Sequence, residues 1–271
     1  MADQLVPTYV INLARSSDRR AHITAQLNTT RTAYQLVDAV DGRELDFTNT
    51  ELFDPSVVGT STFRPGAAGC ALSHLEVYRR LLDDGRDAAL VLEDDVILPT
   101  DLCELAEQVA THMRGAEIVL LNFHSQKPCR VAWAGAVDLP ADRFLVQVVD
   151  ERQPGSTGAY MITREACARM AKAALPVRVH PDNWAFFYRE GAIDRLRCVV
   201  PMPVANSAEH RTTIDYYKPG SLQARIRELV ASFRVPLLYQ ALAVRRQRTF
   251  RRWGWVGKTE FVDELPVGKR N

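Results

Sequence analysis

The chain has 271 residues, 46% of them hydrophobic and 25% charged, a composition that suits one large globular domain or a domain with an appendage. Its formal net charge is only +1, so the chain as a whole has no electrostatic preference for nucleic acid or for acidic ligands. We therefore expect no nucleic-acid partner, and any charge preference has to be local.

The cysteines and the first residues bear on the compartment. Five cysteines are spread along the chain without a C-x-x-C pair, a pattern typical of reduced thiols rather than of a disulfide framework. They are Cys70, Cys103, Cys129, Cys167 and Cys198. The first apolar run is too brief for a signal peptide or a membrane span. We expect a soluble cytoplasmic protein.

Apolar residues in the first half of the chain alternate between strand-like and helix-like patterns. In chain order we expect a strand at residues 9–13, a helix capped by Ser17 or Asp18 and continuing to about residue 27, a strand at 34–40, a helix from residue 68 to a stop at Gly85, and a strand at 88–92. The last strand is apolar throughout, as a strand covered on both faces would be.

The second half continues this alternation. We expect an amphipathic stretch around residues 102–109, a strand at 118–123, short strands and turns over 131–149, a strand at 159–162, and a helix at 164–174 that Pro176 ends. Strands that alternate with helices predict an α/β fold around a mainly parallel central sheet.

Three adjacent acids follow the buried strand at residues 88–92. Ligands bind outside the carboxyl ends of strands in open α/β sheets, so Glu93, Asp94 and Asp95 are expected at the mouth of a site. If the chain stays extended there, Glu93 and Asp95 point to one side and offer hard oxygen ligands to Mg²⁺ or Mn²⁺ that could bridge a diphosphate. The alternative is a solvated acidic turn.

Further polar candidates lie after other expected strands. Asn12, Arg15 and Arg19 surround the loop after the first strand, where they could meet a phosphate or a base, or simply form a solvated basic helix start. Asp41 before Gly42 either makes a turn or accepts hydrogen bonds from a ribose or uracil.

Histidines supply a second group of candidates. Ser73 and His74 lie beside the apolar stripe of the helix at 68–84, and a single helical histidine is more often packed than ligating. His124 follows the strand at 118–123. His210 could return to the metal, although a loop histidine is usually solvated.

Two later loops could face a substrate. Residues 155–158 (GSTG) lack the spacing of a phosphate loop or a dinucleotide fingerprint and are interpreted as a tight, substrate-facing loop. In residues 180–184 (HPDNW), Asp182 is either a helix N-cap or a carboxylate beside Trp184, an aromatic platform on which a sugar could lie.

Four segments, taken in order, resemble glycosyltransferase family 25, a lipopolysaccharide-biosynthesis family that also includes collagen galactosyltransferases. They are residues 10–20 (VINLARSSDRR), 38–42 (DAVDG), 69–75 (GCALSHL) and 89–96 (ALVLEDDV), with looser matches at 158–162 and 181–184. The resemblance spans roughly residues 6 to 215.

This resemblance implies a nucleotide-diphospho-sugar transferase (GT-A) fold, a donor such as UDP-galactose, and an inverting transfer to a lipopolysaccharide or lipooligosaccharide acceptor. Glu93 and Asp95 would be metal ligands, with His210 as a further candidate ligand. The donor site would be lined or supported by Asn12, Arg15, Arg19, Asp41, Gly69, Ser73 and His74. Asp94 and Asp182 are the candidate catalytic residues, and Asp182 is our own candidate for the general base.

The C-terminal part differs in composition from the rest. We expect a catalytic domain at residues 1–217 and a basic amphipathic extension at 218–271, in which eight arginines lie among apolar and aromatic residues between 221 and 255. Such a segment suits adsorption to anionic lipid on the inner face of the cytoplasmic membrane, at about 1 kcal/mol per arginine near the surface. The alternative is a helix packed on the core with a solvated basic face.

Two other functions fit parts of the pattern. A non-catalytic nucleotide- or glycan-binding protein of the same fold would keep the pocket without the transfer. A glycoside hydrolase would need two acids about 5 to 9.5 Å apart across a sugar and no nucleotide.

Overall fold

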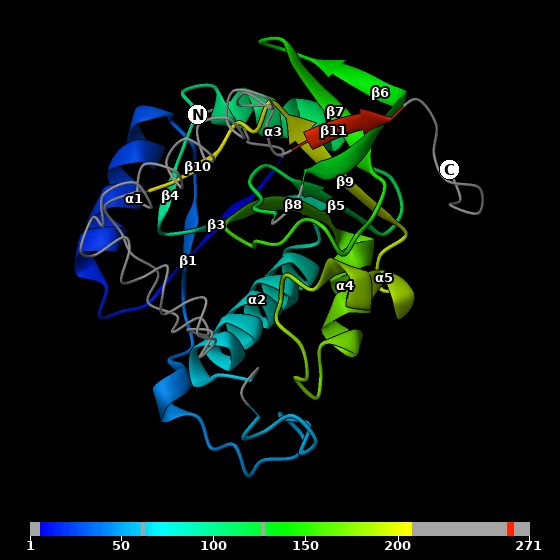
Figure 1. Ribbon diagram of the computed structural model, residues 1–271. Coiled ribbons are helices and arrows are strands. Elements are labelled where there is room, and N and C mark those ends of the chain that lie inside the picture. Colours follow the sequence, from blue (N-terminus) through cyan, green and yellow to red (C-terminus); the bar gives the residue numbers. More distant parts are fainter. Residues whose placement is uncertain (1–5, 61–62, 126–127, 208–258, 263–271) are drawn as a thin grey trace, which may run out of the picture.

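The computed structural model describes residues 6–60, 63–125, 128–207 and 259–262. Its centre is a nine-stranded sheet with the strand order β11-β6-β7-β9-β5-β8-β3-β1-β2 (Figure 1). Its strands, in that order, are β11 (Thr259–Val262), β6 (Cys129–Leu139), β7 (Arg143–Val148), β9 (Arg195–Val200), β5 (Glu117–Leu120), β8 (Ala159–Thr163), β3 (Ala88–Glu93), β1 (Thr8–Asn12) and β2 (Gln35–Asp38). A separate two-stranded sheet pairs β4 (Val96–Ile97) with β10 (Ala205–Asn206).

The large sheet is mixed, and the expectation of a mainly parallel sheet is wrong. Strand β1 runs parallel to β2 and β3, and β5 runs parallel to β9. Strand β8, however, lies antiparallel between β3 and β5, and β7 lies antiparallel between β6 and β9. The apolar run of β8 is buried on both faces, so its residue pattern carries no information about its direction.

Helices cover both faces of the sheet. Helix α2 (Pro65–Asp84), α4 (Arg164–Ala173) and α5 (Trp184–Arg189) contribute to one apolar core. Helix α1 (Ser17–Thr29) and α3 (Leu102–His112) contribute to the other. Because alternate side chains of a strand enter opposite faces, Ile11 belongs to the first core and Val10 to the second. Two covered faces explain why β1 and β3 are apolar almost throughout.

The helix ends follow local chemistry with two departures from expectation. Helix α2 ends at Asp84 and is capped by Gly85, whose φ of 68° is left-handed, which confirms the predicted stop. Its start lies at Pro65, before the predicted residue 68, because proline suits the first helical position. The N-cap of α1 is Ser16 rather than Ser17 or Asp18, and its side chain makes no capping hydrogen bond.

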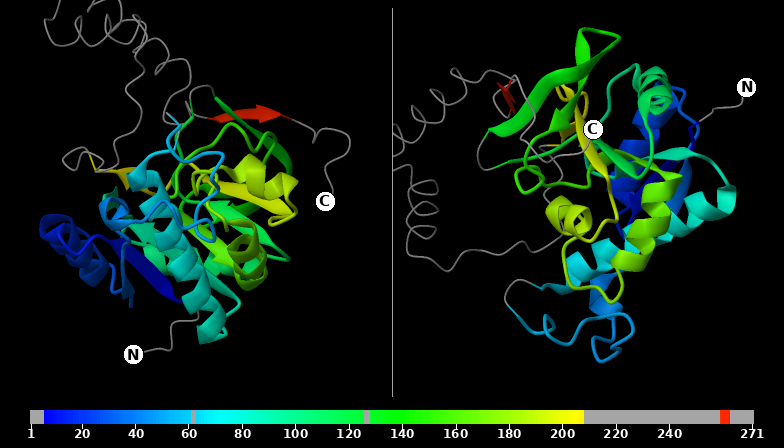
Figure 2. Two further views of the ribbon diagram at one scale, coloured as in Figure 1. Left: turned by 90° about the horizontal axis from the view of Figure 1, so that it is seen from below. Right: turned by 90° about the vertical axis from the view of Figure 1, so that its right-hand side faces the viewer.

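The middle of the chain forms longer strands than expected. Strands β6 and β7 make a projecting hairpin whose register shifts between Ala132 and Val137 (Figures 1 and 2). Strand β11, which belongs to the expected C-terminal extension, runs parallel to the outer edge of β6. The proposed domain boundary near residue 217 and the arginine-rich stretch lie outside the described residues. Within the described part of the chain, none of the helices is both long enough and apolar enough for a membrane span.

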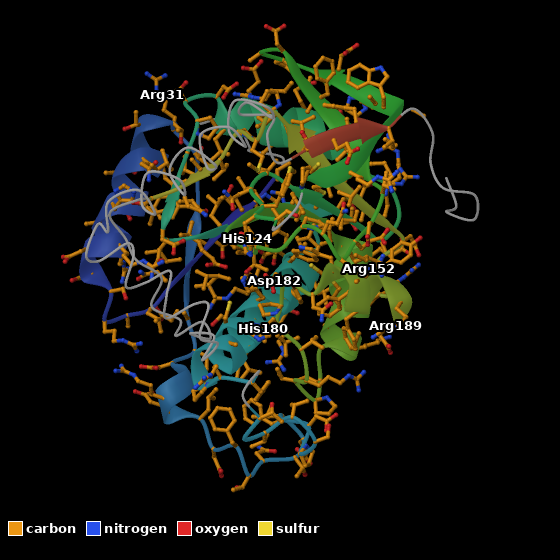
Figure 3. The ribbon with its side chains drawn as sticks, in the orientation of Figure 1. Arg31, His124, Arg152, His180, Asp182 and Arg189 are labelled. Carbon is orange, nitrogen blue, oxygen red and sulfur yellow. The ribbon has the colours of Figure 1, made fainter. Side chains whose placement is uncertain are left out.

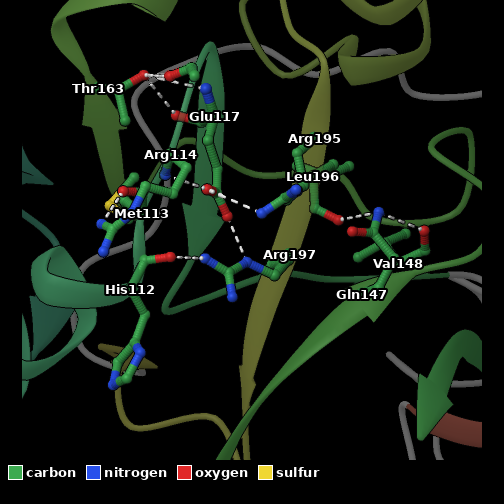
Figure 4. Close-up of polar contacts among 11 residues, drawn as sticks. His112, Met113, Arg114, Glu117, Gln147, Val148, Thr163, Arg195, Leu196 and Arg197 are labelled. Carbon is green, nitrogen blue, oxygen red and sulfur yellow. Dashed lines mark hydrogen bonds and ion pairs between the residues drawn. The ribbon is translucent and has the colours of Figure 1, made fainter. Parts of the chain in front are cut away.

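A buried ion pair joins two strands of the sheet. Glu117 on β5 is completely buried and accepts a hydrogen bond from the Arg197 guanidinium on β9 (Figure 4). The backbone N–H of Arg114 donates to the same carboxylate over 2.9 Å, and Arg197 also donates to the carbonyl of His112 over 2.7 Å. The pair therefore connects β5, β9 and the end of α3.

We expect Glu117→Ala to lower the free energy of unfolding by about 3–5 kcal/mol, because it leaves the Arg197 guanidinium buried without a counter-charge. Urea titration followed by circular dichroism measures the change. Glu165→Ala is the matched control, because Glu165 pairs with Arg169 at the surface and its loss should cost at most about 1 kcal/mol. Equal effects of the two substitutions would contradict the assignment.

Candidate functional site

A cavity of about 320 Å³ opens at the carboxyl ends of β1 and β3, beside the N-terminus of α2. Its volume lies at the lower end of the range for small-molecule sites. Basic side chains line it from the loops after β1 and β2, from helix α1 and from the start of α2, and acidic side chains line it from the end of β3 and the turn that follows. They are Arg15, Arg43 and Arg64 on the basic side, with Asp41 among them, and Glu93, Asp94 and Asp95 on the acidic side, where Arg19 pairs with the last two.

Two glycines allow the loop after β2 to lie against α2. A Cβ atom on Gly42 would lie 1.8 Å from the carbonyl oxygen of Pro65, and one on Gly69 would lie 2.5 Å from the carbonyl oxygen of Val40. Ser73 holds the same contact, because its hydroxyl donates to the Gly69 carbonyl over 2.7 Å and accepts from the Val40 N–H over 2.9 Å. Gly69 and Ser73 thus support one wall of the cavity.

The acidic triplet does not run as an extended chain. Strand β3 ends at Glu93, and the chain turns at Asp94 and Asp95 before β4 begins. The expected alternation of side chains is therefore wrong, because β4 leaves the large sheet to pair with β10. All three carboxylates nevertheless line the cavity, with Glu93 directed toward α2 and Asp95 toward α1, where its partner Arg19 lies.

Asp94 anchors the turn to the first strand and helix. Its side chain is only 6% exposed, and its two oxygens contact the Asn12 amide at 2.6 Å and the Arg19 guanidinium at 2.6 Å. Burial raises the pKa of Asp94, and Arg19 and Asn12 oppose that rise by stabilising the charged form. With both oxygens engaged, Asp94 is placed to position its neighbours rather than to exchange a proton with a substrate.

Glu93 and Asp95 carry opposite pKa shifts. Burial raises the pKa of Asp95 to about 6, and the charge of Glu93 adds to the rise. Burial also opposes ionisation of Glu93, but the nearby His74 imidazole and the Thr157 hydroxyl, which donates over 2.6 Å, hold its pKa below the usual value. Carboxylate oxygens are ligands that Mg²⁺ and Mn²⁺ prefer, so the donor chemistry of this pair fits a hard divalent cation.

The basic side of the cavity is organised around Asp41. Its carboxylate accepts from the backbone N–H of Arg43 over 3.1 Å and so caps the short helix η1 (Gly42–Glu44). The guanidinium groups of Arg15 and Arg43 both pair with it. Asp41 thus makes the turn that one interpretation of the sequence predicted, and it also lines the cavity.

A second group of polar residues adjoins the cavity through the loop at 155–158. Thr157 of this loop contacts Glu93, and Ser156 has a left-handed φ of 133° while its hydroxyl donates to the Asn122 side chain over 3.0 Å. A Cβ atom on Gly155 would lie 3.1 Å from Asp182 Oδ2 and 3.2 Å from His124 Nε2. The loop therefore brings Asp182 and His124 together next to Gly155 (Figure 3).

The structure corrects two predictions, that Asp182 caps a helix and that Trp184 is a platform for a sugar. Asn183 caps α5, because its side chain accepts from the Phe186 N–H over 3.1 Å, and Asp182 is left half-buried beside Gly155. Trp184 is completely buried against Tyr160, with ring centroids 5.7 Å apart, so it is a core residue and not a platform for a sugar. A tryptophan directly after a helix cap enters the core here because α5 packs on the sheet.

Two sequence candidates remain, His74 and His210. His74 is buried on α2, and its Nδ1 lies 2.8 Å from the Tyr160 hydroxyl. His210 lies outside the described residues. Cys70 and Thr157 also contribute side chains near Glu93, and the sequence interpretation did not single them out. A signal for Cys70 was present, because it precedes His74 by four residues and so shares a helix face with it.

A family model described as "Glycosyltransferase family 25 (LPS biosynthesis protein)" matches residues 5–184. Procollagen galactosyltransferase 1 of Danio rerio is 34% identical over 95 residues, which cover 32% of this chain and 16% of that protein. The lacto-N-neotetraose biosynthesis glycosyltransferase LgtE of Neisseria meningitidis serogroup B is 33% identical over 94 residues, covering 34% of this chain and 33% of the relative.

A third relative, of Rattus norvegicus, is described as "Probable inactive glycosyltransferase 25 family member 3" and is 28% identical over 131 residues, covering 44% of this chain and 23% of that protein. The matched segments thus span a third or less of each of these relatives. The family model, in contrast, covers well over half of the chain and includes the cavity and its acidic triplet. The chain belongs to glycosyltransferase family 25.

Proposed function

We propose that the chain is a UDP-sugar-dependent hexosyltransferase that transfers galactose, with inversion, to a lipopolysaccharide or lipooligosaccharide acceptor. The observation that carries this proposal is one cavity with guanidinium groups on one side and three carboxylates on the other, at the carboxyl ends of β1 and β3. Galactose is chosen because a relative of this chain is named a galactosyltransferase. We also propose that the mixed α/β core has a GT-A-like arrangement.

The donor diphosphate fits the basic side of the cavity. Arg15 and Arg43 already share the single carboxylate of Asp41, so the two cations together exceed the negative charge beside them. The first turn of the 20-residue helix α2 contributes Pro65 and Gly66 to the lining, and the N-terminus of a helix favours an anion. A uridine ribose would then lie near Asp41, and Asn12 would support the site through its hydrogen bond to Asp94.

Glu93 and Asp95 are the residues that would hold Mn²⁺ or Mg²⁺. The bound cation would supply positive charge next to the leaving diphosphate. Arg19 pairs with Asp94 and Asp95 and thereby keeps the acidic turn in place. To hold the cation, Asp95 would have to give up part of its contact with Arg19.

Asp182 is the proposed general base. In the transfer step the acceptor hydroxyl oxygen forms a bond to the anomeric carbon, the bond from that carbon to the diphosphate oxygen breaks, and Asp182 takes the hydroxyl proton. A single displacement of this kind inverts the configuration. His124 lies next to the same glycine and would hydrogen-bond the acceptor sugar.

The donor assignment is tested by titration calorimetry with UDP-galactose, UDP-glucose and UDP-N-acetylglucosamine in the presence of Mn²⁺. UDP-galactose is expected to bind most tightly. GDP-mannose is the control for recognition of the uracil nucleobase and should bind weakly. Preference for another UDP-sugar would change the hexose and leave the rest of the proposal in place. No binding of any uridine nucleotide would contradict it.

A non-catalytic nucleotide- or glycan-binding role is the second candidate. Two observations favour it: Arg19 already neutralises part of the acidic turn, and one relative is described as probably inactive. Such a protein would bind a UDP-sugar but would not cleave it, so no free UDP would form. Family membership favours transfer over the hydrolysis of a glycoside.

We further propose that the arginine-rich residues 221–255 adsorb to anionic lipid on the inner face of the cytoplasmic membrane. Replacement of Arg245, Arg246 and Arg248 by Gln removes charge while it keeps β11, which pairs with the core. We expect the native chain to float with vesicles rich in phosphatidylglycerol and the triple variant to float much less. Equal flotation would contradict the membrane proposal.

A further inference from the structure

We propose that Cys70, His74 and Glu93 form a binding site for Zn²⁺ within the cavity. One thiol sulfur, one imidazole nitrogen and one carboxylate oxygen, one from each residue, all lie within 4.8 Å of one another. In the described part of the chain this is the one group of three or more such side chains found this close together. Three protein ligands with a fourth position open to the cavity are the arrangement of a catalytic-type zinc site.

The backbone brings these three side chains together from two elements. Cys70 and His74 are four residues apart on α2 and so lie on one face of the helix, directed at the end of β3, where Glu93 is the last residue. His74 Nε2 lies 3.5 Å from Glu93 Oε1. Two ligands bound tetrahedrally at about 2.0–2.2 Å are separated by roughly 3.4 Å, so this pair already has the spacing that zinc requires.

The orientation of His74 favours a ligand at Nε2. His74 Nδ1 lies 2.8 Å from the Tyr160 hydroxyl, which is itself 3.4 Å from the Tyr78 hydroxyl, so in the metal-bound tautomer the Nδ1–H would donate to the Tyr160 oxygen. The lone pair of Nε2 then faces the Cys70 and Glu93 side chains. This nitrogen is buried and makes no hydrogen bond to any described residue, and its 3.5 Å separation from Glu93 Oε1 is too long for a well-formed one.

Two electron-pair donors that face each other need a cation between them. The Nε2 lone pair and the Glu93 carboxylate would repel each other across 3.5 Å unless a proton or a metal ion lies there. Tyr160 supplies the hydrogen bond to the outer nitrogen that ligating histidines usually make. The alternative occupant, a proton on His74, is an outcome of the experiment below.

The thiol decides which metal the site prefers. Sulfur is a soft ligand and favours Zn²⁺ over Mg²⁺ and Mn²⁺, which prefer oxygen. The site is therefore chemically distinct from the Glu93 and Asp95 pair assigned above to a hard cation, although both contain Glu93. The zinc proposal does not rest on the proposed transfer reaction, because metal binding is measured without a donor or an acceptor.

The test uses Co²⁺ as a spectroscopic substitute for Zn²⁺ on the purified, metal-free full chain. We expect one equivalent of Co²⁺ to produce a thiolate-to-cobalt charge-transfer band, and Zn²⁺ to displace it. Cys70→Ser should abolish the band, whereas Cys103→Ser, which changes a half-buried cysteine on α3, should leave it unchanged. Tyr160→Phe should weaken Zn²⁺ binding by about 10- to 100-fold, because His74 Nδ1 loses its hydrogen bond to the Tyr160 hydroxyl.

Several results would overturn the proposal. The absence of a charge-transfer band in the folded native chain would show that a proton, not a metal, occupies the space beside His74. A band that persists in Cys70→Ser would place the metal at another cysteine. Circular dichroism of each variant confirms that the chain is folded, and unchanged UDP binding in the zinc-free protein separates this result from a failure of the donor-site assignment.

Discussion

Asp182→Asn is expected to lower the turnover number by about 10²- to 10⁴-fold, because the amide cannot take the proton from the acceptor hydroxyl. The affinity for the donor should stay nearly unchanged, since Asp182 is not among the residues that line the donor cavity. Steady-state kinetics with varied acceptor, together with calorimetry of UDP binding, separates the two effects. The substitution removes one charge and changes almost no volume.

Asp194→Asn is the matched control for this experiment. Asp194 lies on the surface away from the cavity, where it pairs with Arg169, and the change from Asp to Asn is the same. The activity of this variant should remain at the native level. Gly155→Ala is a milder perturbation of the same place, because its Cβ would lie 3.1 Å from Asp182 Oδ2 and 3.2 Å from His124 Nε2, so both side chains would have to shift slightly and turnover should fall. If Asp182→Asn keeps native turnover, another group is the base.

The double substitution Glu93→Gln and Asp95→Asn should abolish metal-dependent UDP binding, with an affinity at least about 100-fold lower in the presence of Mn²⁺. Both carboxylates line the cavity, and the amides that replace them are neutral and weak ligands for a hard cation. Titration calorimetry with and without Mn²⁺ isolates the metal-dependent part. The Asn12, Arg19 and Asp94 contacts should keep the turn folded.

A matched double variant controls for the loss of two charges. Asp83 and Glu104 are exposed on α2 and α3, so Asp83→Asn with Glu104→Gln makes the same change of net charge away from the cavity. That variant should bind UDP and Mn²⁺ as the native chain does. Undiminished metal-dependent binding after the Glu93 and Asp95 substitutions would refute their assignment as metal ligands.

Much of the fold was predictable because burial and helix ends leave local signals. The uniformly apolar run at 88–92 indicated a strand covered on both faces, and in the structure it is β3, an interior strand between β8 and β1. Gly85 indicated the end of α2 because only a residue that tolerates a left-handed φ closes a helix in this way. Strand direction left no such signal, so the antiparallel β8 was missed.

The candidate site was also predictable only where local signals determine it. The rule that ligands bind at the carboxyl ends of strands brought Asn12 and Glu93 into one predicted site, and β1 and β3 are indeed parallel neighbours. His124 and Thr157 contact residues that are far away in the sequence. These contacts depend on the path that the loop at 155–158 takes before β8 begins. Local sequence patterns contain no information about the path of this loop.

The Trp184 error has a similar cause. An aromatic residue beside a carboxylate suits either a sugar platform or a helix that packs on a core, and the two alternatives differ only in which way α5 faces. The structure buries Trp184 against Tyr160 because α5 lies on the α2 and α4 side of the sheet. The residue types here are those of a sugar-binding site, but the packing of α5 places Trp184 in the core.

Release of UDP from a UDP-sugar tests the central claim most directly. The purified full chain is incubated with UDP-galactose and Mn²⁺, with and without a lipooligosaccharide acceptor, and free UDP is measured over time. We predict release that requires the metal, increases with the acceptor and is lost in Asp182→Asn. Tight UDP binding without any acceptor-stimulated release, across UDP-galactose, UDP-glucose and UDP-N-acetylglucosamine, would contradict the transferase and identify the chain as a nucleotide-binding member of its family.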